Sequence, residues 1–250
     1  METHIVCPSG LAGSARGLKI KEGSLFTDRR LLRQGLIVDR VLGRCWIETT
    51  DPGPYDFGDK GIDWGKVLQG DRFFALLQMR AATYGPQYAF GLNCQNDVCR
   101  ERFEWELNLL ELPVKKLPAE SAENFKNGNR FETVLPAAGR KVWFRLLTGE
   151  DERKIPALRS KAEGDLMTAL FAFRIVEIEG VKPQDKSKFV EDLELSDAMF
   201  LRSEFDRVDC GVETNIEVEC PLCLTVQEID LPFEKTFFLA EAGKKTREGR

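Results

Sequence analysis

The chain has 250 residues, of which 42% are hydrophobic and 31% charged, with 36 basic against 41 acidic side chains. This length suits one large domain or two small ones, and 17 Phe and 4 Trp are too many for a disordered chain. The formal charge of -5 gives no broad attraction for a polyanion, which argues against non-specific nucleic-acid binding. His4 is the only histidine, so Ser-His-Asp triads, histidine-rich catalytic zinc sites and two-histidine iron sites are excluded.

The sequence predicts neither a membrane span nor a secretory signal. It contains no run of about 18 apolar residues, and its start lacks a basic region followed by an apolar one. We therefore expect a protein that is made and kept, at least at first, in a cytoplasm. There, the seven cysteines are expected to be reduced thiols or metal ligands rather than a disulfide framework.

The N-terminal third of the chain is expected to be mainly helical. Residues 1–20 predict a loop or a short strand with turns. Apolar residues at helical spacing then predict a helix over 22–49, which Gly35 divides in two. A loop rich in Gly and Pro follows at 51–61, and then a core helix over 63–83.

Two later segments change to period two on both sides of a short polar tip. Apolar residues alternate around the tip that carries Cys94 and Cys99, which predicts a β-hairpin with one buried face. The arrangement recurs around Cys220 and Cys223. A phase slip near Gln227–Glu228 suggests a β-bulge in this second hairpin.

The segment between these hairpins predicts an inserted α+β unit. Residues 131–135 and 141–146 form a third hairpin, and Thr148 then offers a hydroxyl N-cap with an acid at the third helical position. The helix that starts there is expected to reach Lys161, with a kink or break at Pro156.

The end of the inserted unit is expected to be helical. Residues 165–178 are apolar nearly all round, which predicts a buried helix. A last helix starts at Ser196.

The two cysteine pairs are the strongest candidate site. Four residues separate Cys94 from Cys99 and two separate Cys220 from Cys223, each pair at a hairpin tip. Zinc binds four thiolates at about 2.3 Å in a tetrahedron, and a short hairpin loop can present two sulfurs together. Two facing tips would therefore form a zinc-ribbon-like site, with Pro221 stiffening the second loop. We expect one structural zinc per chain, because four protein ligands leave no open position for catalysis.

Two alternatives remain open for these cysteines. A redox-active pair is less favoured, because no helix follows Cys223 to lower its thiol pKa. A disulfide within each pair would need exposure outside a cell. Cys7, Cys45 and Cys210 are most simply small buried apolar groups.

These elements predict an α+β protein whose zinc-ribbon-like module is built from two hairpins far apart in the chain. The expected parts are an N-terminal helical region (1–85), the β module (86–111 with 214–238), the inserted α+β unit (112–213) and a flexible tail (239–250).

Other candidate chemistry is thin. The acidic loop 51–63 lacks the spacing of a calcium loop and is expected to be solvated. Asp71 and Arg72 could form an ion pair or a partner contact, and a salt-bridged helix surface is the favoured interpretation. We find no glycine-rich phosphate loop, nucleophile elbow or paired-carboxylate cleft, and expect no enzyme activity.

A series of motifs runs in order through most of the chain: PSG (8–10), GDRFFALLQMRAATYG (70–85), the strand leading into the first cysteine pair, FRLLTGEDER (144–153), EFDRVDCGVET (204–214), and IEVECPLC with its LPFEKTFF ending (216–238). With these motifs the chain resembles the baseplate hub assembly proteins of contractile-tailed bacteriophages. The four residues between Cys94 and Cys99 depart from the two that are common in zinc ribbons.

The resemblance implies a non-enzymatic role in building or forming the central hub of the baseplate. The implied partners are hub, tail tube or tape-measure proteins, with neither a membrane nor nucleic acid expected. The implied location is the host cytoplasm during assembly, and the tail baseplate if the protein stays in the virion.

Aromatic side chains are candidate contacts to such partners. Trp46 and Trp64 are expected in the core instead, whereas Phe237 and Phe238 are the better candidates for contact. The alternative function is a zinc-ribbon nucleic-acid-binding regulatory protein, which the glutamates flanking both cysteine pairs argue against.

Overall fold

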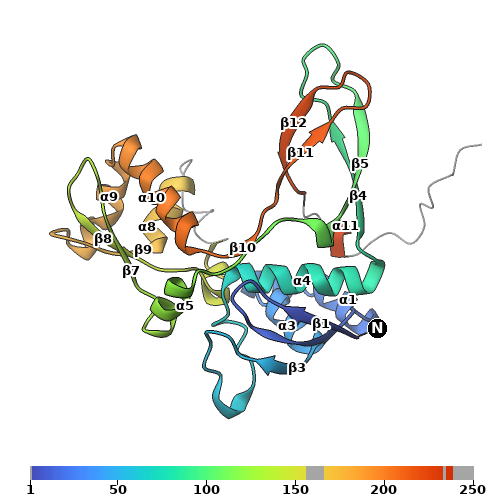
Figure 1. Cartoon of the computed structure of the whole chain (residues 1–250), viewed down its shortest axis with the longest axis horizontal. Helices are drawn as coiled ribbons and strands as arrows, with labels where there is room; N and C mark the ends of the chain where they lie inside the picture. The colour runs from blue at the N-terminus through green and yellow to red at the C-terminus, as the bar shows by residue number, and fades with distance from the viewer. Residues whose placement is uncertain (1, 156–165, 233–234, 239–250) are drawn as a thin grey trace, which may run out of the picture.

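The computed structural model describes residues 2–155, 166–232 and 235–238. Figure 1 shows three parts that meet at one long helix: an N-terminal part, an arm of two hairpins and a mixed unit. Helices and small antiparallel sheets of two or three strands build these parts, which fits the expected α+β class. No described helix is both long and apolar enough to cross a membrane. The tail predicted at 239–250 lies outside the described residues.

A three-stranded antiparallel sheet opens the chain, where a loop or short strand was predicted at 1–20 and a helix over 22–49. Its strands, in order, are β1 (Glu2–Val6), β2 (Ala12–Arg16) and β3 (Trp46–Asp51). The predicted helix over 22–49 is therefore wrong beyond Cys45. Residues 46–50 are mainly aromatic or β-branched, which suits a strand, and they pair with β2. Gly13 permits this pairing, because a Cβ there would lie 2.1 Å from the Glu48 carbonyl oxygen.

Short helices connect this sheet to the central helix. They are α1 (Ile20–Gly23), η1 (Ser24–Thr27), α2 (Arg29–Gln34), α3 (Ile37–Cys45) and η2 (Gly58–Lys60). Gly35 ends α2 with a φ of 64°, so it divides the predicted helix as expected. The central helix α4 (Gln69–Tyr84) begins later than predicted, because residues 64–66 form a turn and Leu68 forms a β-bridge with Thr148.

The two hairpins predicted around the cysteine pairs are confirmed. β4 (Gln87–Asn93) pairs with β5 (Arg102–Asn108), and β11 (Asn215–Glu219) pairs with β12 (Val226–Asp230). Together they form the arm, which stands away from α4 (Figure 1). The β-bulge predicted near Gln227–Glu228 is wrong, because Gln227 pairs with Val218 and Glu228 with Glu217 in regular register.

The mixed unit lies between the two hairpins in sequence and contains a second three-stranded sheet, in the order β7–β8–β9. Its elements are β6 (Val114–Lys115), α5 (Ala119–Lys126), β7 (Phe131–Val134), β8 (Lys141–Phe144), α6 (Gly149–Glu152), α8 (Leu166–Arg174), β9 (Ile175–Ile178), η4 (Pro183–Asp185), α9 (Lys186–Glu191), α10 (Leu195–Val208) and β10 (Gly211–Val212). β6 pairs with β10, so the chain enters and leaves this unit side by side.

The strands β7 and β8 confirm the third predicted hairpin. The buried helix predicted over 165–178 is wrong beyond Arg174. The residues that follow include three β-branched side chains and form β9, which pairs with the free edge of β8.

The capping box predicted at Thr148 is confirmed. The Thr148 side chain and the Asp151 side chain each accept from the other's backbone N–H. The helix they start, α6, is only four residues long, and most of the longer helix predicted there falls at 156–165, outside the described residues.

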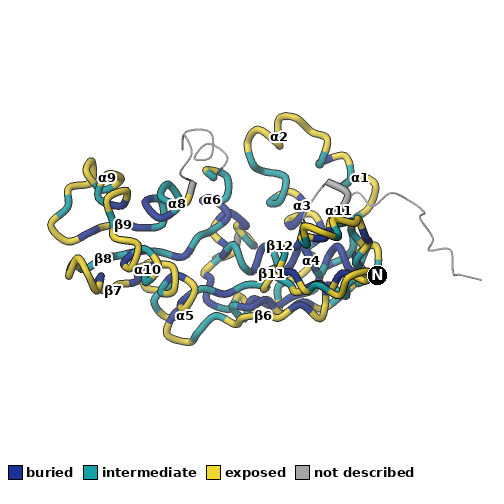
Figure 2. The backbone as a smooth tube through the Cα atoms, turned by 90° about the horizontal axis from the view of Figure 1, so that it is seen from above, coloured by how far each residue is buried: buried dark blue, intermediate teal, exposed yellow. Residues whose placement is uncertain are grey.

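Buried side chains form one large core and two small ones. The large core spans the N-terminal part and the mixed unit, whereas the arm has one small core at its base and another around the cysteines. The 3-10 turn η3 (Leu109–Glu111) links β5 to the base of the arm and contacts α4. Figure 2 shows buried segments along α4 and mostly exposed ones in α2 and α9.

The burial of the four aromatic residues considered as partner contacts agrees with the prediction for the tryptophans and differs from it for Phe237. Trp64 is buried as predicted, and the partly buried Trp46 meets it edge-on with ring centroids 5.4 Å apart. Phe237, in α11 (Lys235–Phe238), is fully buried at the base of the arm. Phe238 is partly buried and stacks on Phe26 at 5.3 Å. The expectation that Phe237 meets a partner is therefore wrong, because this ring anchors the C-terminal segment to the arm's base.

Candidate functional site

The structure brings the four predicted cysteines together at the end of the arm. Their Sγ atoms all lie within 4.8 Å of one another, and among the described residues these four side chains form a group that could hold a metal ion. Cys94 and Cys223 are 3.6 Å apart, and Cys99 and Cys220 are 3.9 Å apart. Sulfurs about 2.3 Å from a central ion in a tetrahedron lie about 3.8 Å from one another. The cluster therefore has the dimensions of a four-thiolate metal site, and its sulfur separations far exceed the roughly 2.05 Å of a disulfide.

Both cysteine loops use the same backbone turn. The N–H of Cys94 donates to the Glu101 carbonyl at 2.9 Å, and that of Cys220 to the Thr225 carbonyl at 3.0 Å. The residue after the second cysteine of each loop has a positive φ, 48° at Arg100 and 58° at Leu224. Neither is glycine, although this conformation costs an L-residue about 1–2 kcal/mol. The longer first loop thus reaches the same local geometry as the shorter second one.

A buried glutamine joins the two hairpins beneath the cysteines. Gln227 accepts at Oε1 from the N–H of Gln95 at 2.8 Å and donates through Nε2 to the Asn93 carbonyl at 3.2 Å. It therefore replaces an apolar residue on the inner face of β12. This polar inner-face residue caused the apparent phase slip in the sequence.

The cysteines differ in exposure and in thiol acidity. Cys220 and Cys94 are buried, whereas Cys223 is exposed. Hydrogen bonds from the side chain and backbone of Thr225 lower the pKa of Cys223 to about 6. The backbone N–H of Asn96 favours the Cys94 thiolate, but burial and the neighbouring sulfurs outweigh it and raise the pKa of Cys94 to about 12. A cation among the sulfurs would favour the deprotonated form of all four thiols.

The other three cysteines are buried in the main core, as predicted. Burial raises the pKa of Cys7, Cys45 and Cys210 above that of a free thiol. These sulfurs are therefore packing groups.

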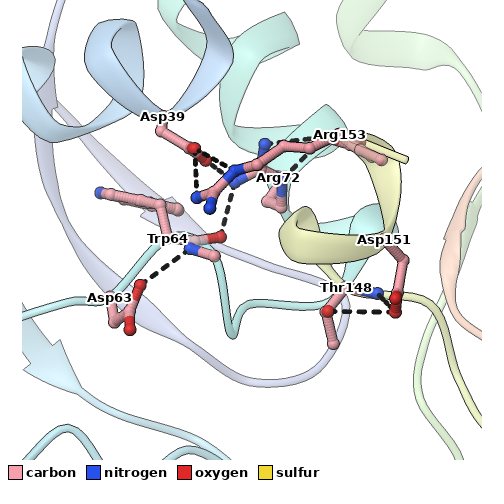
Figure 3. Close-up of polar contacts among 9 residues, drawn as sticks. Asp39, Asp63, Trp64, Arg72, Thr148, Asp151 and Arg153 are labelled. Carbon is pink, nitrogen blue, oxygen red and sulfur yellow. Dashed lines mark hydrogen bonds and ion pairs between the residues drawn. The ribbon is translucent and has the colours of Figure 1, made fainter. Parts of the chain in front are cut away.

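Arg72 lies in a buried ion-pair network rather than on the predicted salt-bridged surface. Its side chain is fully buried, with Nη1 2.5 Å from Asp39 and Nη2 2.7 Å from Glu152. Nη1 also donates to the Trp64 carbonyl at 2.5 Å, and Arg153 forms a second ion pair with Asp39 (Figure 3). Charges from α3, α4 and α6 are thus satisfied by one another inside the protein.

The neighbouring Asp71 is also fully buried, and its carboxylate has other partners than Arg72. It accepts hydrogen bonds from the N–H and hydroxyl of Ser9 and from the Tyr55 hydroxyl, the last at 2.6 Å. Burial raises the pKa of this carboxyl despite these donors. Asp71 therefore fixes the turn between β1 and β2 to the start of α4.

Two glycines allow these segments to approach closely. A Cβ on Gly70 would lie 2.1 Å from the Cys210 carbonyl oxygen. A Cβ on Gly149 would lie 2.4 Å from Nη1 of Arg72 and 2.5 Å from the Trp64 carbonyl oxygen. In the sequence, the only hint of these close approaches was a glycine next to charged residues, in GDR at Gly70 and in TGE at Gly149. An analysis based on the spacing of apolar residues does not detect it.

Comparison with protein families agrees with the order of these motifs. The family model described as T4 bacteriophage base plate protein matches residues 57–239, more than half of the chain. The chain belongs to this family. The matched span includes the whole arm, α4 and the mixed unit, so both the cysteine cluster and most of the buried ion-pair network fall within the base plate family's shared region. Comparisons with curated proteins and with solved structures give no match.

Proposed function

We propose that the protein is a non-enzymatic component or assembly factor of the phage baseplate hub, which acts through contacts with other tail proteins. Membership of the base plate family is the observation that carries this proposal. Hub, tail tube or tape-measure proteins are the proposed partners. The proposed location is the host cytoplasm during assembly and the baseplate of the virion afterwards.

One zinc ion, bound by Cys94, Cys99, Cys220 and Cys223, is proposed to hold the arm in shape. Sulfur separations of 3.6 and 3.9 Å, with all four sulfurs within 4.8 Å of one another, support a tetrahedral ion. Tetrahedral sites with four sulfurs select zinc or iron, and zinc has no redox chemistry to perform. With all four positions taken by protein, the ion would be structural.

The proposed division of the chain follows from this ion. Residues 86–111 and 214–238 would form one module, with 112–213 as an insertion between its hairpins. The pairing of β6 with β10 supports this division, because it brings the two ends of the insertion together.

The charged interior supports a structural rather than a catalytic role. Arg72, Asp39 and Glu152 neutralise one another, and Asp71 is occupied by the hydroxyls of Ser9 and Tyr55. Charges that are paired with one another in this way are occupied within the fold and are not free to act on a substrate.

Charge argues against the alternative, a nucleic-acid-binding zinc ribbon. The arm, residues 86–111 with 214–232, carries nine acidic and two basic side chains. Phosphate groups would be repelled by such a surface.

Deletion of the gene from its phage genome tests the proposal. We expect loss of infectious particles and incomplete tails under the electron microscope, with recovery when the wild-type protein is supplied from a plasmid. Under the proposed role, the baseplate is incomplete without this protein. Normal, infectious particles from the deleted phage would contradict a role in the baseplate.

A further inference from the structure

The outer end of the arm carries four exposed apolar side chains. Val98 is 95% exposed, Leu222 65%, Leu224 68% and Val226 56%. Val98 lies in the first cysteine loop and the other three lie in or next to the second. We call these four residues the apolar tip. Exposed apolar residues gathered at one end of a projecting element are typical of a binding surface.

The cysteine loop fixes the position of Leu224 in the apolar tip. Leu224 holds a φ of 58°, and its N–H donates to the Cys220 carbonyl at 2.9 Å. This turn belongs to the loop itself, since Arg100 has the same conformation after Cys99. The Leu224 side chain is 68% exposed, so the turn presents it to solvent instead of packing it within the chain.

The charge of the arm as a whole indicates what the partner is. Its two basic side chains, Arg100 and Arg102, lie in or beside the first cysteine loop, and Arg100 is paired with Asp97. Exposed Glu217 faces exposed Glu228 directly across β11 and β12, and like charges in this position destabilise a sheet. The arm's nine acidic and two basic side chains disfavour a second copy of the arm, a nucleic acid and an anionic membrane. A basic protein surface would instead be attracted.

We propose that the apolar tip inserts into an apolar pocket on another baseplate protein, and that lysine and arginine side chains surround this pocket. This proposal rests on the proposed baseplate role and adds the surface and the chemistry of the partner. The cysteine cluster sits directly behind the apolar tip, since Val98 precedes Cys99 and both Leu222 and Leu224 adjoin Cys223. A bound ion would thus hold the tip rigid before contact, which lowers the entropic cost of binding.

Binding measurements with purified proteins test this surface. The hub, tail tube and tape-measure proteins of the same phage are titrated one at a time with the full chain by calorimetry. We expect one of them to bind, more weakly as salt rises, because the acidic arm contributes attraction. Val98→Ser with Leu222→Ser should weaken binding at least tenfold. Failure of the wild type to bind any of them, or an unchanged affinity of the double variant, would overturn the proposal.

Leu224→Asn separates binding from stability. Asparagine accepts a positive φ, so the thermal midpoint should equal or exceed that of the wild type while binding weakens. Leu195→Asn, the same change at a leucine that is 71% exposed on α10, is the matched control and should leave binding unchanged. Equal binding by the Leu224 variant would contradict the proposal.

Phage complementation distinguishes the two proposals. If the deletion phage is rescued fully by the Val98→Ser, Leu222→Ser variant, the apolar tip is not the docking surface but the baseplate role stands. If the deletion itself has no effect, the baseplate role fails. Self-association through the tip in light scattering, or a DNA mobility shift that the tip variant abolishes, would also overturn the proposed partner.

Discussion

Replacement of both Cys220 and Cys223 by serine is expected to release the metal ion and to unfold the end of the arm. The core there is small: among the described residues its buried side chains are Cys94, Phe103, Val218 and Cys220. Two-stranded hairpins are marginally stable alone, so the binding energy of the proposed ion would be the main force that joins them. Hydrogen exchange should show lost protection of the amides in β4, β5, β11 and β12, with α4 still protected.

Cys45→Ala is the control for this experiment. Cys45 is also fully buried, but it lies in the main core and far from the cluster. This variant should keep its metal ion and the protection of its arm, with a modest loss of global stability from the small cavity. Equal protection of the arm in the serine variant and the wild type would contradict the role given to the ion.

Arg72→Met is expected to lower the free energy of unfolding by about 3 kcal/mol, because the partly buried Glu152 loses its cation and Asp39 is left with Arg153 alone. Asp39 and Glu152 each contact this guanidinium, at 2.5 and 2.7 Å, and the Trp64 carbonyl would also lose its donor. Since domains are stable by only about 5–15 kcal/mol, the change should be evident in a urea denaturation curve.

The control is Arg207→Met, which removes an arginine from an ion pair on the surface of α10. Arg207 contacts Glu204 at 3.0 Å and its side chain is 58% exposed. Exposed pairs of this kind contribute about 0–1 kcal/mol. If the two variants lose similar stability, the buried network does not hold the parts of the molecule together as described.

The alternation of apolar and polar residues predicted each hairpin, and the two cysteine pairs predicted that the hairpins lie side by side. The alternation of apolar and polar residues involves only a few neighbouring positions in the sequence. The strands β4, β5, β11 and β12 could therefore each be recognised without knowledge of their partners. The hypothesis that four cysteines in two short loops share one ion then placed segments distant in sequence side by side, and the structure brings these four sulfurs together. The capping box at Thr148 is also local, and it was predicted for the same reason.

Features set by distant partners could not be predicted in this way. Arg72 is buried because Asp39 and Glu152, which are 33 and 80 residues away in the sequence, neutralise its charge. The residues next to Arg72 in the sequence do not indicate these partners. The strands β3 and β9 form because a free sheet edge is available, so their helical periodicity was misleading. Gln227 faces inward only because the first hairpin offers it two backbone partners.

The metal content of the purified wild-type protein tests the central claim most directly. Elemental analysis is expected to give one zinc per chain, and X-ray absorption should show four sulfur ligands at about 2.3 Å. Folded protein without a metal ion, or with disulfides linking these cysteines, would contradict a structure in which one ion joins the two hairpins.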